Sequence, residues 1–215
     1  MNKNFYLSPN KFSTNISEKL KIKKENNYFK AMKIKIRDAV KKDMLQVHNL
    51  IVELAVFEKE SDEVDINSKD LETMGFENKT PLFKCFVAEF ENKIVGAAII
   101  YNRFSTWKGK TLHLEDLIVT KKMRGKGIGS KLFDKVILYG KKIAAKRISW
   151  NVIDWNKNAI DFYENRGAKI VDGWSIVHLS GYNLKIINNK FITEILNLIP
   201  ARNIFIYFFV FVCNF

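Results

Sequence analysis

Apolar residues recur with two different spacings in the middle of the chain. Between residues 41 and 58 they return every three or four positions, which predicts an amphipathic helix. The apolar positions of this helix are Met44, Val47, Leu50, Ile51, Leu54 and Phe57. Residues 83–89 and 94–101 are rich in β-branched and aromatic residues on either side of Glu91-Asn92, a pattern that predicts a β-hairpin.

The same patterns predict the remaining elements. Strands are expected over 33–38, 111–120, 147–153, 168–171 and 174–179, and helices over 68–76, 127–142 and 157–165. Ser68 is the expected N-cap of the short second helix. The first strand-to-helix junction carries no glycine fingerprint, so the pattern does not predict a dinucleotide-binding fold. We expect an α/β fold in which a mixed sheet has helices on both faces.

The two ends of the chain differ from this middle part. Residues 1–31 are rich in Lys and Asn without an apolar period, and we expect a disordered or non-native leader, with Met32 the start of the fold. Residues 185–215 form an apolar extension of unknown role that includes the nine-residue run 204–212. A membrane helix needs about 20 residues, so we expect a packed or aggregation-prone strand there. The predicted domain therefore covers residues 32–184.

Composition and charge agree with one globular domain. Apolar residues make up 47% of the chain, and part of the net charge of +13 belongs to the basic leader. The rest suits an anionic small ligand, because the interleaved Arg and aromatic residues of a nucleic-acid surface are missing. Cys85 and Cys213 match no metal or redox spacing. We expect a cytoplasmic protein that binds neither nucleic acid nor a membrane.

A glycine-rich basic turn follows the strand 111–120. In Arg124-Gly-Lys-Gly-Ile-Gly-Ser130 the glycines leave consecutive backbone N–H groups able to face an anion at the positive end of the next helix. A plain glycine turn is the alternative, since so short a motif is weak evidence alone. Its position between a strand and a helix favours the anion site. The G-K-[S/T] ending of nucleoside triphosphate loops is absent, which favours a bound pyrophosphate.

At this turn the sequence resembles the GNAT superfamily of N-acetyltransferases, whose acetyl-CoA loop has the form R/Q-x-x-G-x-G/A. The resemblance extends to the diamine (spermidine/spermine) and thialysine N-acetyltransferases and covers residues 33 to about 178. Its motifs include Glu53-Leu-Ala55, Lys69-Asp-Leu71, Trp107, Leu114-Glu-Asp116, Arg124-Gly125, Gly127-Ile-Gly-Ser130, Trp155-Asn156, Phe162-Tyr163 and Arg166-Gly-Ala168.

The resemblance implies a GNAT-like acyl-CoA N-acyltransferase fold with a mostly antiparallel sheet, acetyl-CoA as co-substrate, no metal and a homodimer. The cofactor-binding residues it implies are Leu117, Ile118, Val119, Arg124, Gly125, Lys126, Gly127, Ile128, Gly129, Ser130, Asn156, Ala159, Tyr163 and Arg166. The residues it implies near the amine substrate are Phe57, Glu58, Glu115, Asp116, Trp150 and Asn151.

Acetyl transfer to an amine requires a neutral nucleophile and a proton for the departing thiolate. An alkylammonium has a pKa near 10.4, so neutralising it at pH 7 costs about 4 to 5 kcal/mol. Glu115 is the candidate base, directly or through water, and His113 is a weaker one; an exposed strand-edge carboxylate is the alternative for Glu115. Asp116 faces the other way in a regular strand, and only a bulge would bring both carboxylates together. Tyr163 is the candidate acid, the role that the resemblance implies for it.

These features predict an acetyl-CoA-dependent N-acetyltransferase that moves an acetyl group to the primary amine of a small diamine, polyamine or thialysine-like substrate. We expect direct attack in a ternary complex, because no Cys lies in the motifs to form an acetyl-enzyme. Polyamine-acetylating relatives have Asp-Pro where this chain has Ser105-Thr106, which weakens the case for long polyamines. Two alternatives stay open. One is acetylation of a protein lysine or N-terminus, and the other is a non-catalytic acyl-CoA-binding module.

Overall fold

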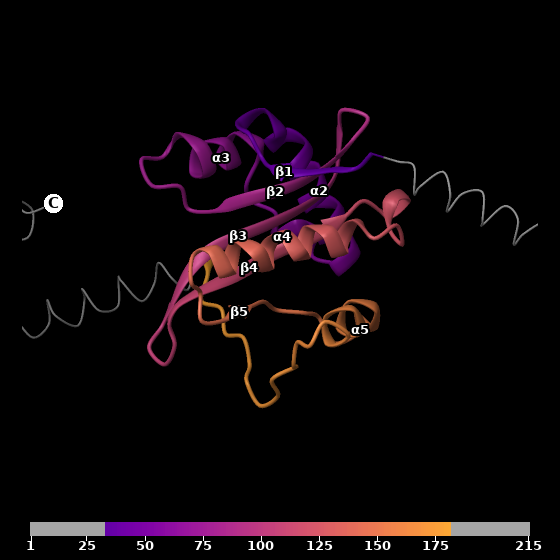
Figure 1. Cartoon of the computed structure of the whole chain (residues 1–215). Coiled ribbons are helices and arrows are strands. Elements are labelled where there is room, and N and C mark those ends of the chain that lie inside the picture. The colour runs from indigo at the N-terminus through magenta and orange to yellow at the C-terminus, as the bar shows by residue number, and fades with distance from the viewer. Residues whose placement is uncertain (1–32, 182–215) are drawn as a thin grey trace, which may run out of the picture. The chain divides into compact units, whose positions relative to one another are not determined.

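The computed structural model describes residues 33–181 (Figure 1), and both the leader 1–31 and the apolar run 204–212 lie outside this range. The strands are β1 (Lys35–Asp38), β2 (Lys84–Phe90), β3 (Lys93–Ser105), β4 (Gly109–Val119) and β5 (Ile148–Ser149). The helices are α2 (Met44–Glu58), α3 (Ser68–Glu72), α4 (Ile128–Lys142) and α5 (Lys157–Glu164). The chain divides into two compact units, one ending at Ile160 and the other beginning at Asp161, and each is described by itself.

The first unit contains one five-stranded sheet in the order β1-β2-β3-β4-β5. The first four strands are antiparallel neighbours, and β5 pairs with β4 in parallel. The β2–β3 hairpin turns at Glu91 and Asn92, whose φ angles of 48° and 61° are those of a tight two-residue turn. The predicted mixed sheet with mostly antiparallel strands is therefore confirmed.

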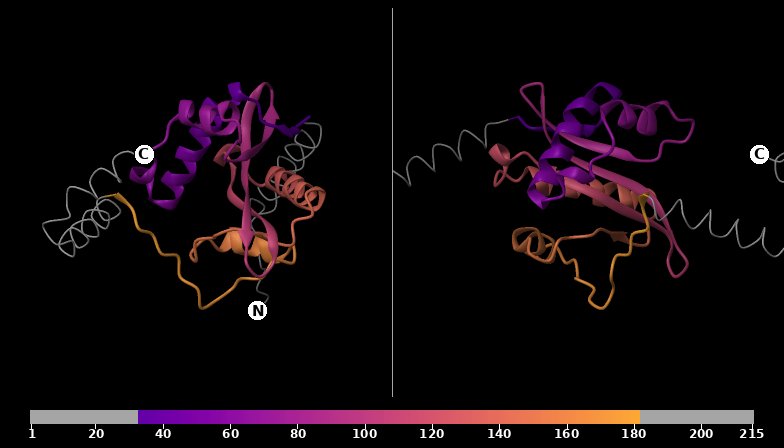
Figure 2. Two further views of the ribbon diagram at one scale, coloured as in Figure 1. Left: turned by 90° about the vertical axis from the view of Figure 1, so that its left-hand side faces the viewer. Right: turned by 180° about the vertical axis from the view of Figure 1, so that it is seen from behind.

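Helices cover both faces of this sheet, as predicted (Figure 2, left). One face packs on α2, where the buried side chains of Met44, Val47 and Leu50 form a cluster with Val87 and Ile99 of the strands. The other face packs on α4, and Phe86 of β2 meets Tyr139 edge-on at 5.8 Å between ring centroids. Each fully buried aliphatic side chain contributes about 1.5 to 3 kcal/mol through the hydrophobic effect.

Several predicted boundaries are wrong. Asn67, not Ser68, caps α3, because its side chain accepts the backbone N–H groups of residues 69 and 70. The helix then continues as a π-helical turn, Thr73–Glu77. The strand expected over 147–153 is reduced to β5, and no strand forms over 168–171 or 174–179. In those last two segments alternating apolar residues stay exposed, Val171 at 70% and Val177 at 87%, so burial does not favour a strand there.

Candidate active site

The acidic strand β4 contains a β-bulge at Glu115. Leu114 pairs with Ile100 of β3 and Asp116 pairs with Ile99, which leaves Glu115 without a partner on β3. The extra residue changes the alternation of side chains along the strand. Asp116 consequently shares the α2 face with Ile99. Glu115 lies on that face too, because its Oε2 is 3.7 Å from Nε2 of His113. His113 is on the α2 face because it pairs with Tyr101. The bulge thus brings both carboxylates to one side of the sheet.

The carboxylates differ in their surroundings. The side chain of Glu115 is 55% exposed, whereas Asp116 is half-buried. Burial, the charge of Glu115 and the charge of Glu58 at the end of α2 raise the pKa of Asp116 to about 6. Burial and the nearby Glu60 also raise the pKa of Glu58. Asp116 and Glu58, whose pKa values are raised, together with the carboxylate of Glu115 form an acidic site suited to a cation.

The edge of β4 is open beyond this bulge. β5 pairs with β4 only through Leu112 and His113, and along residues 114–119 no other described strand pairs with that edge. Backbone N–H and C=O groups on an unpaired edge need a partner. Leu117, Ile118 and Val119, predicted to contact the cofactor arm, lie on this open stretch.

The glycine-rich turn lies between β4 and α4, directly after a single 3₁₀ turn at Lys121–Met123. Gly125 and Gly127 have φ angles of 74° and 75°, a left-handed conformation that glycine adopts without strain, while Gly129 lies inside α4 with an ordinary backbone. The helix begins at Ile128, and the N–H groups of its first turn have no acceptor within the helix. N–H groups at the start of a helix can bind an anion, and the anion site at this turn stays a prediction.

The basic side chains of the turn point elsewhere. Arg124 donates from Nε to the carbonyl of Val119 at 2.8 Å, and its guanidinium lies 3.8 Å from Glu53 and 5.3 Å from the ring centroid of Phe57. Glu53 also accepts the backbone N–H of Lys121 at 2.7 Å. Glu53 and Phe57 are four residues apart on one face of α2. The contacts of Arg124 with Glu53 and Phe57 join α2 to the glycine-rich turn. The sequence pattern did not predict them, because the partners are distant in the chain.

Comparison with known proteins identifies the family of this chain. Residues 45–168 match the Acetyltransferase (GNAT) family. This chain is a GNAT N-acetyltransferase. It is 35% identical over 168 residues to a thialysine N-epsilon-acetyltransferase of Bos taurus, covering 73% of this chain and 98% of that protein. It is 32% identical over 158 residues to the human spermidine/spermine N(1)-acetyltransferase-like protein 1, covering 69% of this chain and 22% of that protein.

Solved structures share the fold of this acetyltransferase. An integron cassette protein from the mobile metagenome of V. cholerae aligns with a TM-score of 0.60 at 22% identity, covering 73% of this chain and 98% of that one. An aminoglycoside acetyltransferase from a soil metagenomic sample aligns with a TM-score of 0.54 at 23% identity, covering 69% and 95%. The predicted family and fold are therefore confirmed.

The predicted residues around α5 make local contacts in the acetyltransferase. Asn156 precedes α5 and accepts the backbone N–H of Ala159 at 3.2 Å, which makes it a helix cap. In the second unit Tyr163 is 8% exposed and its carbonyl accepts the N–H of Arg166 at 3.0 Å. The guanidinium of Arg166 lies 3.9 Å from the ring centroid of Phe162. The functions predicted for these residues remain predictions.

Trp150, one of the residues predicted near the amine, lies apart from α2. Trp150 packs edge-on against Phe133 of α4, at 5.4 Å between ring centroids, and thus lies toward the face opposite α2. Asn151 is exposed. The ring of Phe57 instead packs against the ring of Trp155, with 5.3 Å between centroids. Trp155 belongs to a motif noted in the sequence, but the motif did not indicate this contact. Phe57, Glu58, Glu115 and Asp116 are the predicted substrate residues associated with the α2 face.

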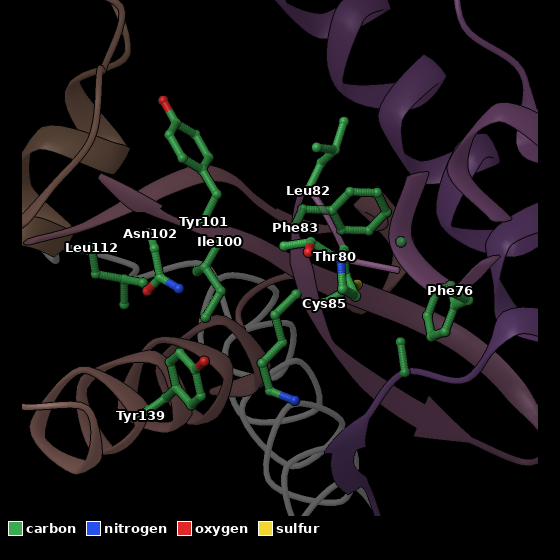
Figure 3. A pocket seen from close by; sticks show the side chains of 14 residues that line it. Phe76, Thr80, Leu82, Phe83, Cys85, Ile100, Tyr101, Asn102, Leu112 and Tyr139 are labelled. Carbon is green, nitrogen blue, oxygen red and sulfur yellow. The ribbon is translucent and has the colours of Figure 1, made fainter. Parts of the chain in front are cut away.

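A cavity of about 600 Å³ lies at another part of the first unit (Figure 3). It forms where β1 ends and leaves the start of β2 uncovered, and Phe83, Cys85 and Tyr139 are among its lining residues. None of the predicted site residues lines it. Burial raises the pKa of the Cys85 thiol to about 12, which makes this thiol a poor nucleophile.

Within residues 33–181 no group of three or more His, Cys, Asp or Glu side chains is arranged to hold a metal ion. Over the same range no helix combines the length and the apolar character that crossing a membrane requires.

Proposed function

We propose that this acetyltransferase moves the acetyl group of acetyl-CoA to the primary amine of a small thialysine-like amino acid or diamine. The observation that carries the proposal is the bulge at Glu115. It puts two carboxylates on the α2 face, where Glu58 also acts on Asp116, at the point where the open edge of β4 begins. That edge leads to the glycine turn, so one strand serves both substrates.

Acetyl-CoA fits the open edge and the turn. Its pantetheine arm carries amide groups that can pair with the backbone of residues 117–119 as an added strand would. Its pyrophosphate suits the N–H groups of Gly125 to Ser130 at the start of α4. Arg124 and Lys126 contribute positive charge near this position, while Arg124 remains tied to Glu53.

The proposed reaction is a direct attack within the ternary complex. Glu115 takes a proton from the substrate ammonium, directly or through water, and the nitrogen lone pair forms a bond to the thioester carbonyl carbon. The bond from that carbon to sulfur then breaks, Tyr163 gives its phenolic proton to the departing thiolate, and the surplus proton on the new amide nitrogen restores the phenol. No acetyl-enzyme forms, in agreement with the poor reactivity of Cys85.

A compact dicationic or amino acid substrate suits the acidic site better than a long polyamine. Glu58 and Asp116 can pair with a second ammonium group of the substrate when both are ionised. Ser105 stands where polyamine-acetylating relatives have a carboxylate, and its Oγ accepts backbone N–H groups of residues 107 and 108 within the β3–β4 turn. The similarity to thialysine acetyltransferases supports the same substrate class.

The test is an assay of acetyl-CoA turnover with thialysine, small diamines, spermidine and lysine-containing peptides, on the full chain and on a protein that starts at Met32. We expect turnover with thialysine or a small diamine and much slower turnover with peptides. Preference for a peptide would favour the protein acetyltransferase alternative. Binding of acetyl-CoA without turnover on any amine would favour the non-catalytic module.

We also propose which part of the chain suffices for activity and how the protein assembles. We expect residues 32–184 to suffice for activity, the extension 185–215 to be dispensable for chemistry, and the protein to be a cytoplasmic homodimer. Phe104 and Trp107, near the turn between β3 and β4, are 75% and 77% exposed, which is typical of side chains that a partner covers. Sedimentation of the full chain and of residues 32–184 tests the dimer, and a monomer in both would contradict it.

A further inference from the structure

His113 is buried beside the bulge, and the proposed reaction leaves it without a function. It is 6% exposed, and its ring lies against Tyr101 of β3 at 5.0 Å between centroids. Tyr101 points to the face opposite Tyr139 (Figure 3), which is the α2 face that carries the acidic site. A buried imidazole at this position is a costly group unless its nitrogens have partners.

The two ring nitrogens of His113 have different environments. Nε2 lies 3.7 Å from Oε2 of Glu115, slightly longer than a hydrogen bond. Nδ1 is buried and has no hydrogen-bond partner among the described residues. Ser149, which pairs with His113 across the β4–β5 ladder, has a buried Oγ that also lacks one in this part of the chain. Paired residues project to the same face, so His113 and Ser149 are neighbours on strands that lie about 4.8 Å apart.

We propose that His113 is a positioning residue for Glu115, holding the exposed carboxylate toward the amine by donating from Nε2, while Nδ1 and Ser149 Oγ share a bound water. This inference rests on the proposed function. Glu115 sits on a bulge with an exposed, rotatable side chain, and a donor fixed by packing on Tyr101 restricts where its carboxylate can lie. Nδ1 of His113 and Oγ of Ser149, which have no partner among the described residues, can both hydrogen-bond to a buried water.

Burial, more than the neighbouring charges, favours the neutral form of His113. Burial lowers the pKa of His113, Arg103 of β3 lowers it further, and Glu115 of β4 opposes them. Tyr101 adds no charge, because burial and Glu115 raise the pKa of its phenol, and Ser149 of β5 does not titrate. At pH 7 the imidazole therefore donates one proton without neutralising the base. In acid the imidazolium and the Glu115 carboxylate form an ion pair, and the neutral donor proposed here is lost.

Two substitutions separate positioning from packing. His113→Gln keeps an N–H group near the place of Nε2, and His113→Phe keeps a ring without a donor. We expect kcat to fall about tenfold in the Phe variant and less than threefold in the Gln variant, with KM for acetyl-CoA unchanged in both. His48→Gln is the matched control, because His48 lies on α2 with its Nε2 2.9 Å from the carbonyl of Ile66, and it should leave kcat unchanged.

The pH profile provides a second readout. The ratio of wild-type to His113→Phe kcat should be constant above pH 7 and fall toward one as the pH drops below 6, because protonation removes the benefit of the wild-type imidazole. Equal losses in the Gln and Phe variants, or a ratio independent of pH, would overturn the positioning function and leave packing alone.

A measurement without substrate keeps this inference separate from the proposed function. The chain contains three histidines, so imidazole NMR spectra can be assigned with single substitutions. We expect His113 to be the Nε2–H tautomer at pH 7 and Glu115→Gln to lower its pKa further, because the carboxylate no longer stabilises the imidazolium. An unchanged His113 titration in that variant would overturn the contact, whereas failure to acetylate any amine would overturn only the proposed function.

Discussion

The sheet contains two bulges, and they differ in what the extra residue does. On β3, Gly96 pairs with Ala88 and Ile94 pairs with Glu89, which makes Val95 the extra residue, and it is 8% exposed. On β4 the extra residue is Glu115, whose side chain is 55% exposed. The Val95 bulge serves packing, while the Glu115 bulge displays a charged group.

The two bulges also treat the backbone differently. Beside Val95, the N–H of Ile94 donates to the side-chain oxygen of Gln46 on α2 at 2.9 Å, so a polar group from the helix satisfies the disturbed ladder. Beside Glu115, burial and the charge of Glu115 raise the pKa of Asp116, and the carboxylate of Glu58 on α2 adds to this effect. The same helix therefore contributes a hydrogen-bond acceptor to one bulge and a further negative charge to the other, a difference typical of a structural and a functional site.

Glu115→Gln should give the largest effect. We expect kcat to fall about a thousandfold, because general-base catalysis contributes roughly 10² to 10⁴, while the urea midpoint stays within error since the side chain is exposed. Steady-state kinetics with the best amine and urea unfolding measure the two quantities. Turnover within tenfold of wild type would exclude Glu115 as the base.

Asp116→Asn should change how stability depends on pH. The pKa of Asp116 in the folded protein is about 6, above its ordinary value of 3.8, so the native state keeps a proton that the unfolded state loses, and its stability falls as the pH rises through that window. At about 1.4 kcal/mol per unit of pKa, the loss approaches 3 kcal/mol. The variant should therefore gain stability relative to wild type between pH 4 and pH 6.5 in urea titrations. A constant difference across this range would contradict the buried acidic site.

Tyr163→Phe tests whether Tyr163 of α5 gives a proton to the departing thiolate, as Glu115 at the bulge is proposed to take one from the amine. We expect kcat to fall about a hundredfold because the thiolate must leave unprotonated, with little change in the affinity for acetyl-CoA measured by calorimetry. Tyr139→Phe on α4 is a matched phenol control and should retain activity. Near wild-type turnover of the Tyr163 variant would eliminate its function as the acid.

Val95→Ala should give the smallest effect and only on stability. Removing two buried methyl groups costs about 2 kcal/mol in the free energy of unfolding. We expect kcat to stay unchanged, since this bulge carries no reacting group. A loss of activity larger than the loss of folded protein would show that the two bulges are coupled.

Local sequence signals predicted most of the fold. The spacing of Met44, Val47 and Leu50 predicted α2, the pair Glu91-Asn92 predicted the hairpin, and the glycines before Ile128 predicted the turn that begins α4. These elements depend on periodicity and on backbone freedom, which are properties of consecutive residues. The strands predicted after Gly167 failed because alternation alone does not bury a strand.

The sequence by itself determined which groups are present: two adjacent carboxylates, a glycine turn and a tyrosine in a family motif. Only the tertiary structure decided that Glu115 and Asp116 share a face, because a bulge is set by the hydrogen-bond register of β4 against β3. It likewise decided that Arg124 pairs with Glu53, and that His113 lies beside Glu115 in a buried site. Such contacts join residues whose environments depend on how distant segments pack, and spacing along the chain does not encode that packing.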